Sequence, residues 1–141
     1  MLKLIGYWKE NEQDFRWIRP KLLVAPQWEL KNRRAICEYL RSGICVMDYL
    51  GYSFCRFPNG PTNEEMGNSE LSDGVWVWPV GLVVYVEKYH VRLPDEFINH
   101  MKQYDFKIPT NLKAENIECY PMDIDFWEKW GKEQMRLSGD K

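Results

Sequence analysis

The chain has 141 residues, of which 45% are hydrophobic and 28% charged, and its formal net charge at pH 7 is −2. This length and composition are typical of a single compact domain over residues 1–141. No segment is strongly basic, which argues against nucleic-acid binding, and no apolar stretch reaches the ~20 residues that span a bilayer. We therefore expect a cytoplasmic protein with neither a nucleic-acid nor a membrane partner.

The N-terminal part of the sequence predicts extended segments around one helix. Residues Leu2–Trp8 alternate weakly and indicate an edge strand. The apolar run Leu22–Val24 lies between two prolines, which is typical of an extended segment at a sheet edge. Apolar side chains fall on one stripe over Trp28–Arg41 and predict a helix, which Gly43 is expected to end in a left-handed conformation.

The middle of the sequence predicts short strands and turns. Residues Ile44–Tyr49 and Tyr52–Phe57 are expected strands on either side of Gly51. A loop is expected over Pro58–Gly67, which is rich in glycine, proline and asparagine. The pair Asp73-Gly74 predicts a turn before a short strand over residues 75–78.

The C-terminal half predicts three helices. Pro79 is expected to open the first of them, in which Tyr85 and Tyr89 recur at helical spacing. Pro94 begins the second in the same way, and Asp123 is expected to cap the third. The predicted fold class is α+β, a small mainly antiparallel sheet with three or four helices packed on it.

The cysteines and histidines do not form a metal-binding pattern in the sequence. Cysteines at positions 37, 45, 55 and 119 have no close-paired spacing, and the two histidines are ten residues apart. We expect reduced thiols in the cytoplasm, with no metal and no cofactor.

One set of residues suggests catalysis. Arg56 follows Cys55 directly and would favour its thiolate, while His90 or His100 would serve as base and Asp73 would orient it. Strand alternation, however, sends Cys55 and Arg56 to opposite faces. A buried structural thiol is therefore the preferred interpretation, and a small cysteine-dependent hydrolase or transferase is the alternative.

A second set suggests partner binding. Trp76 and Trp78 share one face of the expected strand, and they form either the core or a docking patch, because tryptophan is enriched at binding hot spots. Glu64, Glu65 and Asp73 would add acidic contacts beside them.

Three segments carry longer patterns. They are Ser53-x-Cys55-Arg56-Phe57, Asp73-Gly74-x-Trp76-x-Trp78-Pro79-x-Gly81-Leu82 and Val91-Arg92-Leu93-Pro94. Together they resemble a group of small bacterial proteins of unassigned function. The resemblance implies kinship without an activity, and members of that group carry histidine where this chain has Val84.

The expected function is that of a non-enzymatic protein-binding domain. Its most concrete form is a bacterial immunity-type protein that neutralises a toxin domain, because an acidic protein suits a basic nuclease by charge complementarity. Besides the cysteine enzyme, the alternative is a structural subunit of a homo-oligomer that uses its aromatic face as the interface.

Overall fold

The structure is a computed structural model that describes residues 1–139. Its strands are β1 (Lys3–Leu4), β2 (Ile44–Asp48), β3 (Ser69–Ser72) and β4 (Trp76–Pro79). Its helices are α1 (Arg33–Arg41), α2 (Asn63–Met66), α3 (Leu82–Tyr89), α4 (Asp95–Gln103) and α5 (Asp125–Ser138), with 3-10 turns η1 (Pro20–Leu23) and η2 (Ala114–Asn116).

The four strands form one mixed sheet in the order β1-β4-β3-β2. Strand β1 runs parallel to β4, whereas β3 is antiparallel to both β4 and β2. The α+β class and the number of substantial helices are confirmed, but the expected mainly antiparallel sheet is wrong. The reason is that β1 comes from the N-terminus and reaches β4 without a hairpin, so no turn fixes its direction.

The turn predicted at Asp73-Gly74 and the short strand after it are confirmed, and the turn joins β4 to β3 in a hairpin in which Ser72 pairs with Val77. Gly74 has a φ of +92°, a left-handed conformation that favours glycine. The Asp73 carboxylate closes the turn, because its Oδ1 accepts hydrogen bonds from the backbone N–H groups of Val75 (2.9 Å) and Trp76 (2.7 Å).

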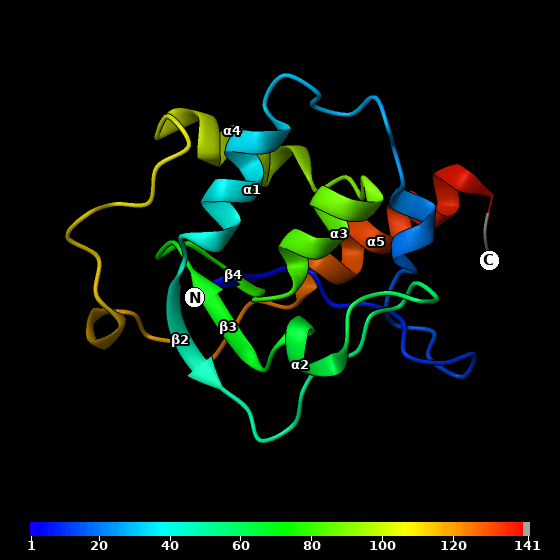
Figure 1. Cartoon of the computed structure of the whole chain (residues 1–141), viewed down its shortest axis with the longest axis horizontal. Coiled ribbons are helices and arrows are strands. Elements are labelled where there is room, and N and C mark those ends of the chain that lie inside the picture. Colours follow the sequence, from blue (N-terminus) through cyan, green and yellow to red (C-terminus); the bar gives the residue numbers. More distant parts are fainter. Residues whose placement is uncertain (140–141) are drawn as a thin grey trace.

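The two faces of the sheet carry different cores. Leu71, Trp76 and Trp78 belong to the main core, which α1, α3 and α4 cover from one side (Figure 1). A smaller cluster on the other face is built on Leu2, Leu4 and Val77, with partly buried apolar residues from the segment after α4 packed against it. That segment, yellow to orange in Figure 1, runs around the outside of β2 before α5 begins.

Several N-terminal expectations are corrected. Residues Leu22–Val24 are not an extended segment: Pro20 opens a 3-10 turn that ends at Leu23, because proline has its φ preset for a first helical position. Only Val24 pairs, in an isolated bridge to Val91. The first helix begins at Arg33 and not at Trp28, since turns precede it and Glu29 has a φ of 47°.

Gly43 follows the C-cap of α1, but it does not form the left-handed cap that the sequence predicted. Its φ is not positive, so no left-handed cap forms there. A Cβ atom at Gly43 would lie 2.7 Å from Trp78 Cζ2 and 2.8 Å from Leu71 Cβ. The glycine is needed because the chain passes directly over the core face of the sheet.

The strand expected over Tyr52–Phe57 is also wrong, while the one over Ile44–Tyr49 is confirmed as β2. Strand β2 pairs with β3, some twenty residues later in the chain, and leaves Tyr52–Phe57 without a ladder. The expected loop over Pro58–Gly67 is interrupted by the single turn of α2.

The three C-terminal helices are confirmed as α3, α4 and α5. The prediction that Pro79 opens the first of them is wrong, because Pro79 is the last residue of β4 and α3 begins at Leu82, with Gly81 as its N-cap. Pro94 occupies the N-cap position of α4. Asp123 lies just before α5, and its Oδ1 accepts a hydrogen bond from the N–H of Asp125 at 3.0 Å. Within residues 1–139, no helix combines the length and the apolar character needed to cross a membrane.

Candidate functional site

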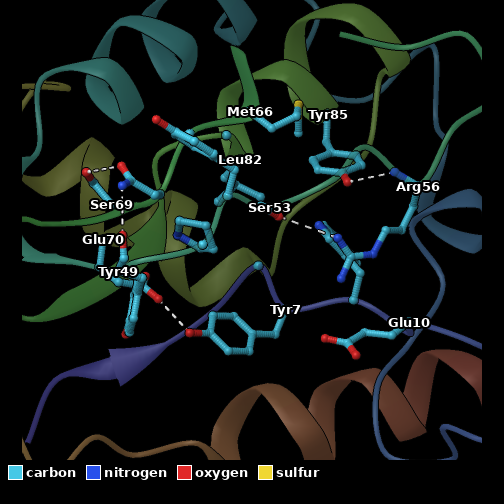
Figure 2. A pocket seen from close by; sticks show the side chains of 18 of the residues that line it. Tyr7, Glu10, Tyr49, Ser53, Arg56, Met66, Ser69, Glu70, Leu82 and Tyr85 are labelled. Atoms are coloured by element: carbon cyan, nitrogen blue, oxygen red, sulfur yellow. Dashed lines mark hydrogen bonds between the residues drawn. The ribbon is translucent and has the colours of Figure 1, made fainter. Parts of the chain in front are cut away.

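A cavity of about 230 Å³ lies between the N-terminal segment, the loop after β2 and the start of α3 (Figure 2). Aromatic side chains make up much of its wall, and they are Tyr7, Trp8, Trp17, Tyr49, Tyr52 and Tyr85. The charged residues in the lining are Glu10, Arg56 and Glu70. The lining contains neither cysteine nor histidine, so it is not the site of the nucleophile and base that the sequence suggested.

Glu70 is the most unusual residue of the cavity. It lies on β3 and is only 2% exposed. Its Oε1 accepts a hydrogen bond of 2.5 Å from the Tyr7 hydroxyl, but its Oε2 is fully covered and has no hydrogen-bond partner among the described residues. Burial raises the pKa of Glu70, while the hydrogen bond that the Tyr7 hydroxyl donates to its Oε1 opposes that shift.

The sheet explains why Glu70 is buried on this side. Leu71 packs into the main core, and adjacent residues of a strand point to opposite faces, so Glu70 points to the face of the small cluster. Tyr7 packs partly against that cluster. Burial of the Tyr7 hydroxyl, and then the neighbouring Glu70, raises the Tyr7 pKa, so this hydroxyl stays protonated and can donate.

A second covered polar atom lies in the same wall. Trp8 is 4% exposed, and its indole Nε1 has no hydrogen-bond partner among the described residues. The ring is fixed by Tyr85 at 5.2 Å and Trp127 at 5.3 Å between centroids. Buried polar atoms in native proteins are nearly always hydrogen-bonded. Trp8 and Glu70, which both line this cavity, each have one covered polar atom without a partner among the described residues.

The opposite end of the cavity holds Arg56 and Glu10, away from Glu70 (Figure 2). The Arg56 side chain donates to the carbonyl oxygen of Phe54 at 2.6 Å and to that of Lys9 at 3.4 Å. Its guanidinium also lies 3.7 Å from the centre of the Phe54 ring. Arg56 is therefore engaged with the loop that carries it and makes no ion pair with Glu70.

An exposed apolar loop borders the cavity. We call residues Tyr49–Phe54 the aromatic loop, and Tyr49, Tyr52 and Ser53 of this loop line the cavity. Leu50 is fully exposed, Tyr52 is 55% exposed and Phe54 is 41% exposed. Large apolar side chains gathered on one exposed segment are typical of an interaction surface.

The residues of the suggested catalytic set do not converge. Asp73 lies under the β3–β4 turn, where its Oδ2 accepts a hydrogen bond from the Tyr39 hydroxyl and lies 3.2 Å from His100 Nε2. Asp73 therefore meets His100 and not His90. Because its two oxygens accept hydrogen bonds from three donors, two of them backbone N–H groups of the turn, this carboxylate stabilises the hairpin.

The other residues of the suggested catalytic set lie away from the β3–β4 turn. His90 has a left-handed backbone (φ 58°) and forms the C-cap of α3. Cys55 is half-buried, and its Sγ is the nearest side-chain atom to the Cβ position of Gly60, at 2.5 Å. Arg56 lines the cavity, but Cys55, Asp73 and His90 do not.

The suggested partner-binding residues are also separated. Trp76 and Trp78 are buried, and the Trp78 indole donates to the carbonyl oxygen of Leu40 at 3.1 Å. Asp73 is buried as well, while Glu64 and Glu65 are exposed on α2. The arrangement thus favours the core interpretation for both tryptophans.

Comparison with models of known protein families, with curated proteins and with solved structures found no match for this chain. Within the described residues, no three His, Cys, Asp or Glu side chains are grouped so that they could hold a metal ion. Glu70 and the aromatic loop were missed at the sequence level. The signal that could have revealed the aromatic loop was the high density of aromatic residues over Tyr49–Phe57. These aromatic residues were instead explained as parts of two expected strands.

Proposed function

We propose that this protein is a non-enzymatic protein-binding domain that docks through its aromatic loop. The observation that carries the proposal is the exposure of Leu50, Tyr52 and Phe54 on one short segment. Tyrosine and other aromatic residues supply much of the binding energy at protein interfaces. Exposing them to water is unfavourable unless a partner covers them.

The more specific form of the proposal is neutralisation of a toxin domain. It is supported by the net charge of −2, which favours a basic partner. Glu64 and Glu65 lie on α2, three and two residues before Gly67 of the cavity wall, so acidic side chains are available near the docking surface.

The test is protection of cells from a toxin encoded beside this gene, combined with binding of the purified toxin domain. Replacing Leu50 and Tyr52 together with serine is expected to weaken binding by a factor of about 30 or more and to abolish protection. Leu30→Ser is the matched control, because Leu30 is also exposed (57%) but lies outside the aromatic loop. It is expected to bind and protect as the wild type does.

The outcomes separate the proposal from its rivals. Full protection by the Leu50/Tyr52 double variant would contradict docking through the loop. Self-association of the wild type in sedimentation analysis, abolished by the same double variant, would instead assign the loop to an interface between copies of this chain and overturn the proposal of a foreign partner.

A further inference from the structure

We propose that the cavity beside the aromatic loop binds an organic cation, an ammonium or guanidinium group, with Glu70 as its counter-charge and Tyr7, Trp17 and Tyr49 as its aromatic wall. The inference extends the proposed function, because the cation is either a lysine or arginine side chain of the protein partner or a free small amine. The recognition chemistry is the same in both cases.

The first argument is the unpaired carboxylate oxygen. Glu70 Oε2 is covered and accepts no hydrogen bond from the described residues, although the side chain lies in the cavity wall. A buried carboxylate needs a charged or hydrogen-bonding partner to offset its lost hydration. An ammonium or guanidinium group supplies both the donors and the opposite charge.

The second argument is the balance of charge and the nature of the wall. The charged residues of the lining are Glu10, Arg56 and Glu70. Glu10 and Arg56 lie at the far end, where carbonyl oxygens and the Phe54 ring hold the guanidinium, so the lining places no positive charge beside Glu70 (Figure 2). The remaining wall is rich in Tyr and Trp rings, whose faces attract cations. The Glu70 end therefore favours positive charge.

The third argument is the unpaired indole N–H of Trp8 in the same wall. It can donate only to an acceptor, so the preferred ligand carries a carbonyl or hydroxyl oxygen besides its cationic group. A lysine or arginine side chain with its own backbone carbonyl meets this description, as does a small amino alcohol.

Entry requires one side chain to move, since Oε2 is covered in this structure. We assign that movement to Tyr49, because it lines the cavity and is 39% exposed on the aromatic loop.

The experiment is calorimetric titration of the full chain with three probes: ethanolamine, the blocked lysine Nα-acetyl-lysine methylamide, and its neutral counterpart Nα-acetyl-norleucine methylamide. The two cations are expected to bind, whereas the neutral norleucine compound is expected not to bind. Tighter binding of ethanolamine indicates a free amine as the natural ligand, and tighter binding of the blocked lysine indicates a partner side chain.

Glu70→Gln is expected to weaken cation binding at least about tenfold, since it removes the counter-charge and keeps the shape. Glu115→Gln makes the same charge change on η2, outside the cavity, and is expected to bind as the wild type does. Circular dichroism of both variants establishes that each is folded. Equal affinity of Glu70→Gln and wild type, or no binding of either cation, would overturn the proposal.

The pH dependence of cation binding gives a second readout that does not depend on a variant. Tyr7, Tyr49 and Cys119 are the titratable groups that face Glu70, and the pKa of each is raised, so all three stay protonated at neutral pH. Because the cation binds the ionised form of Glu70, its affinity is expected to fall as the pH is lowered through the Glu70 pKa, which burial raises. An affinity that does not change from about pH 4 to about pH 8 would contradict Glu70 as the ligand.

The same titrations distinguish this inference from the proposed function. Leu50→Ser, at a residue of the aromatic loop that does not line the cavity, is expected to weaken binding of the protein partner while retaining ethanolamine. A different outcome is that the wild type binds the cations and yet neither binds the toxin domain nor protects cells from it. In that case the cavity assignment stands and the docking proposal fails.

Discussion

Glu70 shows how burial changes which form of a carboxyl group is preferred. With only 2% of its surface exposed, this side chain loses the hydration that stabilises a carboxylate, and its pKa rises in the folded state. In the unfolded chain the same group has the ordinary glutamate pKa of about 4.3. The difference makes the stability of the whole protein dependent on pH.

We predict that Glu70→Gln flattens part of this dependence. The pKa is raised by folding, so the contribution of Glu70 to stability is fully present below the unfolded-state pKa and is lost as pH rises through the folded-state pKa. Between those two values the wild type loses about 1.4 kcal/mol of unfolding free energy per pH unit relative to Glu70→Gln. Urea denaturation from about pH 4 to about pH 8 measures the difference, and parallel curves for the two proteins would contradict the prediction.

At the scale of elements, the connection between α1 and β2 depends on close packing. Gly43 lies against Trp78 and Leu71, the residues that form the core face of the sheet. An added methyl group has no space there, because the nearest atoms belong to a fully buried tryptophan ring and to a Cβ atom of the sheet. The last turn of α1 is therefore fixed against β4.

We predict that Gly43→Ala destabilises the protein by about 1–3 kcal/mol, as overpacking does in other cores. Gly51→Ala is the control, since a Cβ atom there would meet no atom within 4 Å. Its unfolding free energy is expected to stay within about 0.5 kcal/mol of the wild type. Thermal or urea unfolding measures both variants, and a neutral Gly43→Ala would refute the packing argument.

The elements that sequence reasoning predicted well are those with local causes. The Asp73-Gly74 turn and the proline before α4 act on their immediate neighbours, so their effects can be inferred without knowing the fold. Strand β3 escaped detection because Ser-Glu-Leu-Ser contains three polar residues, all of which the sheet buries or half-buries. Only the tertiary structure determines that burial.

The same distinction applies to the candidate site. Cys55, Asp73 and His90 were predicted as catalytic residues from their side-chain chemistry. In the structure, however, the β3–β4 hairpin places Asp73 in contact with Tyr39 and His100. Glu70 was not selected, because nothing near it in sequence indicates that its carboxyl group is covered. The cavity combines segments around residues 7, 53 and 70, and sequence periodicity does not reveal contacts across such separations.

At the scale of the whole molecule, the two ends of the chain are packed together. Leu4 N–H donates to the carbonyl oxygen of Asp123 at 2.9 Å, and Asp123 N–H donates to that of Leu2 at 2.8 Å. The Trp127 indole donates to the carbonyl oxygen of Tyr7 at 2.7 Å, and the ring is fully buried. Strand β1 and helix α5 therefore depend on each other.

We predict that Trp127→Ala destabilises the entire domain and not α5 alone. The expected loss is about 3–5 kcal/mol, the range for removing a buried tryptophan, which lowers Tm by on the order of 10 °C in a domain of this size. Leu137→Ala, at an exposed position of the same helix, is expected to change little. Calorimetry of Trp127→Ala should give one transition, and two separate transitions would contradict the prediction.

The placement of tryptophan in the cavity wall has a practical consequence. Trp8 and Trp17 both line the space beside Glu70, and Tyr7 packs edge-on against Trp17 with 5.9 Å between ring centroids. A charged molecule that enters this space changes the electric field at two natural fluorophores. The protein thus carries an intrinsic optical reporter, and emission spectra of the unlabelled chain can screen libraries of amines for those that occupy the wall.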